Sequence, residues 1–117
     1  MGFEVYIVLL FHWMADFIAQ TDKQATNKSS SWRWLSAHVL TYTLIMSFAF
    51  GIKYGLINGI THLFIDAVTS RASSHFWKKG DRHTFFVVIG LDQLLHTCIL
   101  IYTLPHLGGA LKVIIWQ

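Results

Sequence analysis

Acidic and histidine side chains recur four residues apart at three places in the chain, each time among apolar neighbours. The three pairs are His12 with Asp16 in HWMAD, His62 with Asp66 in HLFID, and Asp92 with His96 in DQLLH. Side chains at positions i and i+4 share one face of a helix, so both members of a pair can point at the same neighbour. Because imidazole nitrogens and carboxylate oxygens bind divalent metals, the first chemistry that this pattern suggests is metal binding.

The order of acid and histidine is reversed in the third pair. If successive long helices run antiparallel, this reversal brings all three acids to one level of the molecule, with the histidines one helical turn away. His38, in the intervening helix, is expected at the same level. The predicted metal ligands are therefore His12, Asp16, His38, His62, Asp66, Asp92 and His96.

This ligand set predicts one or two divalent ions. Mixed nitrogen and oxygen ligation favours zinc, with manganese and iron as alternatives, because no thiolate joins the set to select one metal sharply. Two ions about 3.5–4 Å apart would polarise a phosphoryl or acyl oxygen and activate water. A carboxylate that is not fully committed to metal would act as general base, and Asp16 and Asp92 are the candidates.

Further polar side chains lie beside these residues or one helical turn from them. Such groups often orient metal ligands by hydrogen bonding. For Gln20, an interfacial position is an equal alternative. For Asn58 and Ser70, a hydrogen bond between helices is an equal alternative. The candidates are Gln20, Tyr42, Asn58, Ser70 and Gln93.

The chain around the pairs is unusually apolar. Hydrophobic residues make up 54% and charged residues 13% of its 117 positions, and the mean hydropathy is +0.48. Residues 35–52 and 93–111 contain no Asp, Glu, Lys or Arg, and about 20 apolar residues can cross a bilayer. We therefore expect one all-α domain, 1–117, an integral membrane four-helix bundle with spans at about 3–20, 33–51, 54–70 and 84–104.

Two smaller features refine this expectation. HWMAD and HLFID lie 50 positions apart, which suggests two similar helical hairpins. The C-terminal ALKVIIWQ is too short to span a membrane and is expected to lie in the interface, with Trp116 as an anchor. GIKYG, with two glycines, is expected to form the turn between the second and third spans.

Basic residues set the expected orientation. Seven of the nine lie in the predicted first and third loops, which places these loops in the cytoplasm and both termini outside. The same side chains could recruit an anionic head group or an amphipathic phosphate. The candidates for that role are Arg33, Arg71, Lys78 and Lys79. The basic residues form no helical face of the kind that binds nucleic acid, so no nucleic-acid partner is expected.

The order of these motifs resembles an uncharacterised family of small bacterial and phage inner-membrane proteins, domain of unknown function 3307. The resemblance covers nearly the whole chain, and implies a multi-pass helical protein in the bacterial inner membrane, among membrane lipids, without an established activity. The family often has a second histidine one turn after the first in its second helix, where this chain has Tyr42.

Three functions remain open from the sequence. A charged side chain deep in a membrane span costs about 2.5–3.5 kcal/mol, so seven ionisable groups at one level indicate function. The first hypothesis is an intramembrane metal-dependent hydrolase of a lipid-linked or amphipathic phosphate or ester. The second is a small transporter or proton or metal-ion pathway, which would need a homo-oligomer. The third is a regulatory protein whose metal only staples the bundle.

Overall fold

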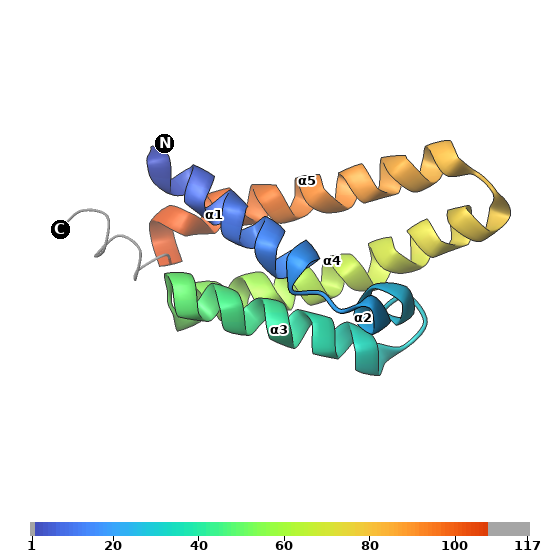
Figure 1. The fold of residues 1–117 in the computed structure, drawn as a ribbon. Helices are drawn as coiled ribbons and strands as arrows, with labels where there is room; N and C mark the ends of the chain where they lie inside the picture. The colour runs from blue at the N-terminus through green and yellow to red at the C-terminus, as the bar shows by residue number, and fades with distance from the viewer. Residues whose placement is uncertain (1, 108–117) are drawn as a thin grey trace.

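The computed structural model describes residues 2–107, and these residues are all-α (Figure 1). A π-helical turn continues the first helix directly, and the second helix is short. The elements are α1 (Phe3–Trp13), the π-helical turn η1 (Met14–Ile18), α2 (Asp22–Asn27), α3 (Trp32–Phe50), α4 (Ile52–Lys79) and α5 (Arg82–Leu107).

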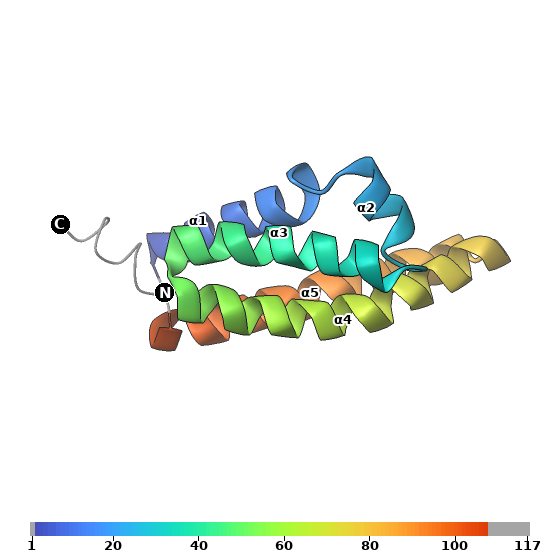
Figure 2. The same cartoon turned by 90° about the horizontal axis from the view of Figure 1, so that it is seen from below.

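The four long helices enclose a common centre. α4 packs along both α3 and α5, and α1 contacts the same two helices. Figures 1 and 2 show that α1 and α4 run in one direction while α3 and α5 run in the other. The alternating directions on which the reversed acid–histidine order depends are therefore present. The two expected hairpins are unequal, because α2 joins α1 to α3 while α4 and α5 meet in a short turn.

Glycines set the packing of α3 against α4. Gly51 has a positive φ of 103° at the turn between these helices, a conformation that glycine adopts without a Cβ clash. Gly55, expected in that turn, lies instead inside α4. A Cβ atom at Gly59 would sit 2.0 Å from Thr43 Oγ1 on α3, so the two helices are in close contact at this point.

The expected loops are largely helical. α4 continues nine residues past the predicted end at position 70, to Lys79, and Gly80 closes it with a left-handed φ of 82°. α5 starts at Arg82, directly after this turn. In the expected first loop, Thr21 and Gln24 form a reciprocal capping box that begins α2. These local signals, rather than hydropathy, determine where the helices end.

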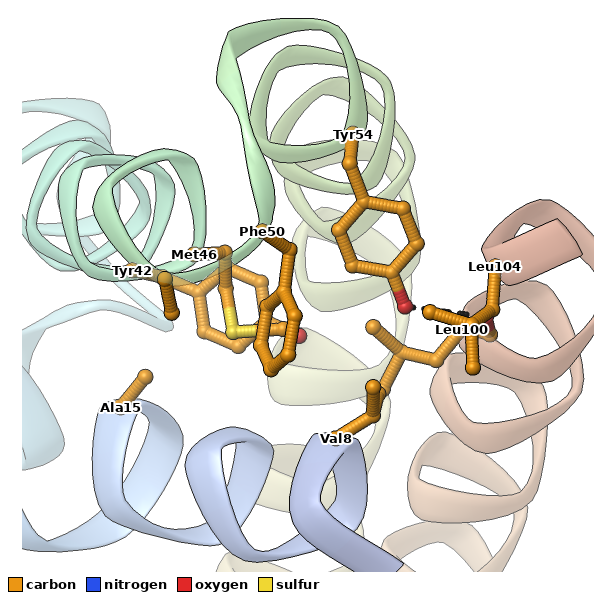
Figure 3. Packing of buried hydrophobic residues seen from close by; sticks show 9 residues of the cluster. Val8, Ala15, Tyr42, Met46, Phe50, Tyr54, Leu100 and Leu104 are labelled. Carbon is orange, nitrogen blue, oxygen red and sulfur yellow. Dashed lines mark hydrogen bonds between the residues drawn. The ribbon is translucent and has the colours of Figure 1, made fainter. Parts of the chain in front are cut away.

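An apolar core fills the end of the bundle near the α3–α4 turn (Figure 3). The Tyr54 hydroxyl donates to the carbonyl oxygen of Leu100 at 2.9 Å, which ties α4 to α5 inside this core. The rings of Phe11 and Phe50 meet edge to face at 5.4 Å. The buried members of the core are Val8, Ala15, Tyr42, Met46, Ala49, Phe50, Tyr54, Leu100 and Leu104.

The expectation of a four-span integral membrane bundle is wrong. Within residues 2–107, only the segment Arg82–His106 is long and apolar enough to cross a membrane. α1 has 11 residues and η1 has five. Together they form roughly 24 Å of helix, which is shorter than a hydrocarbon layer of about 30 Å. α4 has the length, but the charged and polar side chains along it lower its hydropathy. The expected interfacial segment with Trp116 lies outside the described residues.

Large apolar side chains nevertheless occupy the outer faces of the helices. Phe48 on α3 is 93% exposed, Tyr6 on α1 is 73% exposed and Tyr102 on α5 is 74% exposed. Soluble monomers rarely expose contiguous apolar patches of more than a few hundred Å². Many of the apolar residues therefore lie on the surface, while buried positions in the middle of the bundle are polar.

Candidate metal centre

Acids and histidines from all four long helices meet at the centre of the bundle, beside the apolar core. Two groups of side chains present ligand atoms within 4.8 Å of one another, and both groups include Asp16. The first group is Asp16, His38, His62 and Asp66, and the second is Asp16, Asp92 and His96. Six of the seven predicted ligands thus come together in positions that could hold a metal ion.

The first group has the spacing of a tetrahedral metal site. The Nε2 atoms of His38 and His62 face each other at 3.1 Å. Asp16 Oδ1 lies 3.0 Å from the first and 3.4 Å from the second, and Asp66 Oδ2 lies 3.3 Å and 3.2 Å from them. Ligands about 2.0–2.1 Å from a tetrahedral ion are separated by about 3.3–3.4 Å. The donor set and its spacing therefore fit a divalent ion such as zinc.

The two acids of this group can also reach the second group. Asp66 directs Oδ2 at His38 and His62, while its Oδ1 lies 3.1 Å from His96 Nε2. His96 Nε2 is in turn 3.3 Å from Asp92 Oδ1. Asp16 belongs to both groups. Asp66, which offers one oxygen to either side, is therefore suited to bridge two ions.

The π-helical turn carries Asp16. The amide of Ala19 donates to the carbonyl oxygen of Met14 at 2.8 Å, five residues back, which widens the helix at this point. Such turns are rare and occur frequently at functional sites. Asp16 is buried here, and the pattern of apolar residues contains no signal that would have revealed the π-helical turn.

His12, the seventh predicted ligand, is engaged by other side chains. The Tyr42 hydroxyl is 2.8 Å from His12 Nδ1, and Gln93 Oε1 is 2.9 Å from Nε2. The Gln93 amide nitrogen donates to Asp16 Oδ2 at 3.1 Å and to Asp92 Oδ2 at 2.9 Å, so its oxygen must face His12. His12 therefore donates from Nε2 and accepts the Tyr42 proton at Nδ1.

Ring stacking holds His62 in place. Its imidazole lies between the Tyr42 ring, with centroids 4.1 Å apart, and the His96 ring, with centroids 4.0 Å apart. Both contacts are nearly parallel, at 18° and 21°. The Nδ1 atoms of His38 and His62 are buried without a hydrogen-bond partner. The orientation of the His62 ring thus comes from packing rather than from the hydrogen bond that metal-bound histidines usually make.

The electrostatics of the cluster favour charged acids. Burial acts to raise the pKa of Asp16 and of Asp66, but close contacts with the His38 and His62 rings outweigh it and hold both pKa values below the ordinary 3.8. Burial also acts to lower the pKa of His38, and its close contacts with the same two acids outweigh it and raise that pKa. For His12, burial prevails and lowers the pKa, so this ring is neutral.

The predicted supporting residues have different surroundings. Asn58 donates to Thr103 Oγ1 at 3.0 Å, a contact between α4 and α5 away from the acids. Gln20 Oε1 and Ser70 Oγ are buried without a hydrogen-bond partner. Thr69, not predicted for the site, donates to Asp92 Oδ1 at 2.5 Å. Thr69 follows Asp66 by three residues, so the two side chains share a helix face, and this spacing could have predicted Thr69 as a site residue.

Lys28, a lysine of the expected first loop and not one of the four head-group candidates, lies beside the cluster. Its Nζ lies 3.6 Å from Asp66 Oδ2. Of the four candidates, Arg71 stacks on Trp32 at 4.2 Å and donates to the carbonyl oxygen of Ala67. The short helix α2 brings Lys28 to the cluster. Hydropathy and charge counts could not predict this position, because they do not show how the chain runs between α1 and α3.

The comparisons with known proteins give one match. No curated protein and no solved structure matches the chain. A family model described as "Protein of unknown function (DUF3307)" matches residues 5–113, which include every residue of the cluster. The chain therefore belongs to the DUF3307 family.

Proposed function

We propose that this protein is a metal-dependent hydrolase of an amphipathic phosphate or carboxylic ester. One observation carries the proposal: five of the six distances among four ligand atoms of His38, His62, Asp16 and Asp66 are 3.0–3.4 Å, close to the edge length of a tetrahedral site. Zinc suits this set best, and manganese and iron remain alternatives. The second group leaves room for a second ion.

Hydrolysis needs an activated water and a base close to it. A bound divalent ion lowers the pKa of coordinated water to about 7 and stabilises charge that develops on the substrate oxygen. Asp92 is the best-placed base, since it is the most exposed of the three acids, at 9% against 4% for Asp16 and 2% for Asp66. Thr69 and Gln93 hold its two oxygens in place. Asp16, the other candidate base, takes part in both ligand groups.

Metal analysis tests the proposal directly. Protein purified without chelator and incubated with zinc, manganese or iron is expected to retain one or two ions per chain by mass spectrometry of the metals. His38→Ala and His62→Ala should each lose most of this metal. His83→Ala, an exposed histidine outside the cluster, is the matched control and should retain it. Wild-type protein that holds only trace metal under all three conditions would refute the proposal.

Activity separates the hydrolase from its rivals. p-Nitrophenyl phosphate and p-nitrophenyl acetate report phosphate and carboxylic ester hydrolysis, and Asp92→Asn is expected to reduce turnover by 10²–10⁴-fold, roughly the contribution of a general base. Stoichiometric metal without turnover of either ester would favour the metal-stapled regulatory protein. Metal or proton flux into liposomes would favour the transporter.

Attachment to the bacterial inner membrane remains a prediction. Its support is the one candidate span within residues 2–107, Arg82–His106, whose most apolar stretch is only 11% buried, together with exposed aromatic side chains such as Phe48. Association through one helix would leave the cluster accessible to an amphipathic substrate. Extraction of membranes with alkaline carbonate is expected to leave the protein in the pellet, and release into the supernatant would contradict attachment.

A further inference from the structure

A groove between α2, α4 and α5 ends at the acids of the metal centre. Its outer part is a pocket of about 400 Å³, and its inner part, of about 50 Å³, reaches Asp66 and Asp92. The two parts share four lining residues, so they adjoin. The shared residues are Lys28, Ser70, Ser73 and Ile89.

Lys28 places a cation where the two parts meet. Its side chain is 21% exposed, and its Nζ is 3.6 Å from Asp66 Oδ2, an oxygen without a hydrogen-bond partner. An ammonium group has three donors, and at this distance the ion pair does not use them as hydrogen bonds. They are available to an anion in the groove that approaches the metal centre.

Ser70 adds a hydroxyl that lacks a partner. The side chain of Ser70 is 9% exposed, lines both parts of the groove and has no hydrogen-bond partner at Oγ. Ser73, one turn further along α4, directs its hydroxyl to the Ser70 carbonyl oxygen at 3.1 Å instead. Buried hydroxyls are normally hydrogen-bonded, so the unpartnered Ser70 Oγ suits a hydrogen bond to an oxygen atom of a ligand in the groove.

The outer part of the groove carries two aromatic side chains. Trp77 and Phe85 line it, with ring centroids 5.0 Å apart, together with Thr26, Ser29 and Ser74, and Ile89 lines both parts. A ligand that fills the groove would therefore be charged at its inner end and apolar at its outer end.

We propose that the groove binds a phosphate monoester of an apolar or aromatic group. Lys28 and Ser70 contact the phosphoryl oxygens, and Trp77 and Phe85 contact the organic group. This assignment rests on the proposed hydrolase, because Asp66 and Asp92 would repel an anion unless divalent ions neutralised them. A phosphoryl group has three terminal oxygens, enough to contact both the ions and Lys28, whereas a neutral carboxylic ester would leave the lysine unused.

Calorimetric titration of zinc-loaded protein with phenyl phosphate and with inorganic phosphate tests the groove. Lys28→Met is expected to weaken the binding of both ligands by about 10-fold or more, since it removes a charge-assisted hydrogen bond. Ser70→Ala should weaken both by a smaller factor. Trp77→Ala should weaken phenyl phosphate and leave inorganic phosphate unchanged. Lys23→Met, an exposed lysine of α2 outside the groove, should bind both like wild type.

Zinc content of each variant distinguishes the two proposals. If wild type holds zinc but Lys28→Met and Ser70→Ala keep wild-type phosphate affinity, the groove assignment is overturned and the metal centre stands. If wild type holds no metal, both proposals are overturned, because the uncompensated Asp66 and Asp92 would repel the phosphate. Absence of phosphate binding in zinc-loaded wild type overturns the groove assignment.

Discussion

Gln93 connects three members of the cluster through one amide group. It accepts from His12 and donates to Asp16 and Asp92, so it sets the direction of two acids at once. Neighbours that orient metal ligands in this way typically contribute 10–100-fold to metal affinity. The position directly after Asp92 made it a candidate from the sequence, but its contacts with His12 and Asp16 depend on α1 and η1 lying opposite α5.

We expect Gln93→Ala to weaken zinc binding by about 10–100-fold, because Asp16 and Asp92 lose their shared donor. Competition with a chromophoric zinc chelator measures the affinity. Gln20→Ala is the matched control, since Gln20 Oε1 has no hydrogen-bond partner, and it should bind zinc like wild type. Equal loss of affinity in both variants would show that Gln93 has no specific part in the site.

Close contact between α3 and α4 brings His38 and His62 together. Gly55 and Gly59 let the backbones approach, and a Cβ at Gly59 would overlap Thr43 Oγ1. That hydroxyl already donates to the carbonyl oxygen of Val39 at 2.7 Å, so it has little freedom to move. The spacing of the two histidine rings therefore depends on small residues about one and two turns away from His62 along α4.

Gly59→Ala is expected to destabilise the fold by about 1–3 kcal/mol, as overpacked interiors do. Gly90→Ala, on α5, is the control, because nothing lies within 4 Å of the added Cβ. Its helix propensity should stabilise the protein by up to about 1 kcal/mol. Urea unfolding in a mild detergent measures both, and equal stabilities of the two variants would contradict close packing at Gly59.

Asp81 begins α5 as its capping residue. The Thr84 hydroxyl donates to Asp81 Oδ2 at 2.7 Å and the Thr84 amide to Oδ1 at 3.0 Å. These two hydrogen bonds lower the pKa of Asp81 below its ordinary 3.8. The charged cap fixes the position at which α5 starts.

The lowered pKa predicts how this cap responds to pH. Its contribution is complete above pH 3.8 and is lost as the pH falls through the lower folded-state pKa. Asp81→Ala should therefore have a slightly lower melting temperature than wild type at neutral pH, and the difference should shrink in strong acid. A difference that stays constant into strong acid would mean that the carboxylate charge plays no part.

The cluster joins all four long helices, so metal binding should stabilise the whole fold. A ligand at 100 times its dissociation constant adds about 2.7 kcal/mol when it binds only the folded state. For a chain of this length, the melting temperature should rise by roughly 10 °C with zinc. Differential scanning fluorimetry is the measurement, and His62→Ala should abolish the shift. An equal rise in His62→Ala would locate the bound zinc elsewhere.

The element pattern of the chain could be predicted in part. The apolar stretches predict four long helices, and each of them is present, but α4 extends to Lys79 and the helix α2 lies where the sequence predicts a loop. Both differences arise from short-range signals, a capping box and a C-terminal glycine, within polar stretches. Hydropathy also overestimated the number of membrane spans, because α1 and η1 are too short and because polar residues are mixed with the apolar ones along α4.

The sequence by itself determined which acids and histidines share a helix face, because a spacing of four residues follows from the helical repeat. The reversed order in DQLLH likewise follows from alternating helix directions. Only the tertiary structure decided that Nε2 of His38 faces Nε2 of His62, that His12 turns to Tyr42 and Gln93, and that Lys28 reaches Asp66. Those contacts depend on the rotation of each helix about its axis, on the π-helical turn at Asp16 and on the path of α2, which arise from packing between distant segments.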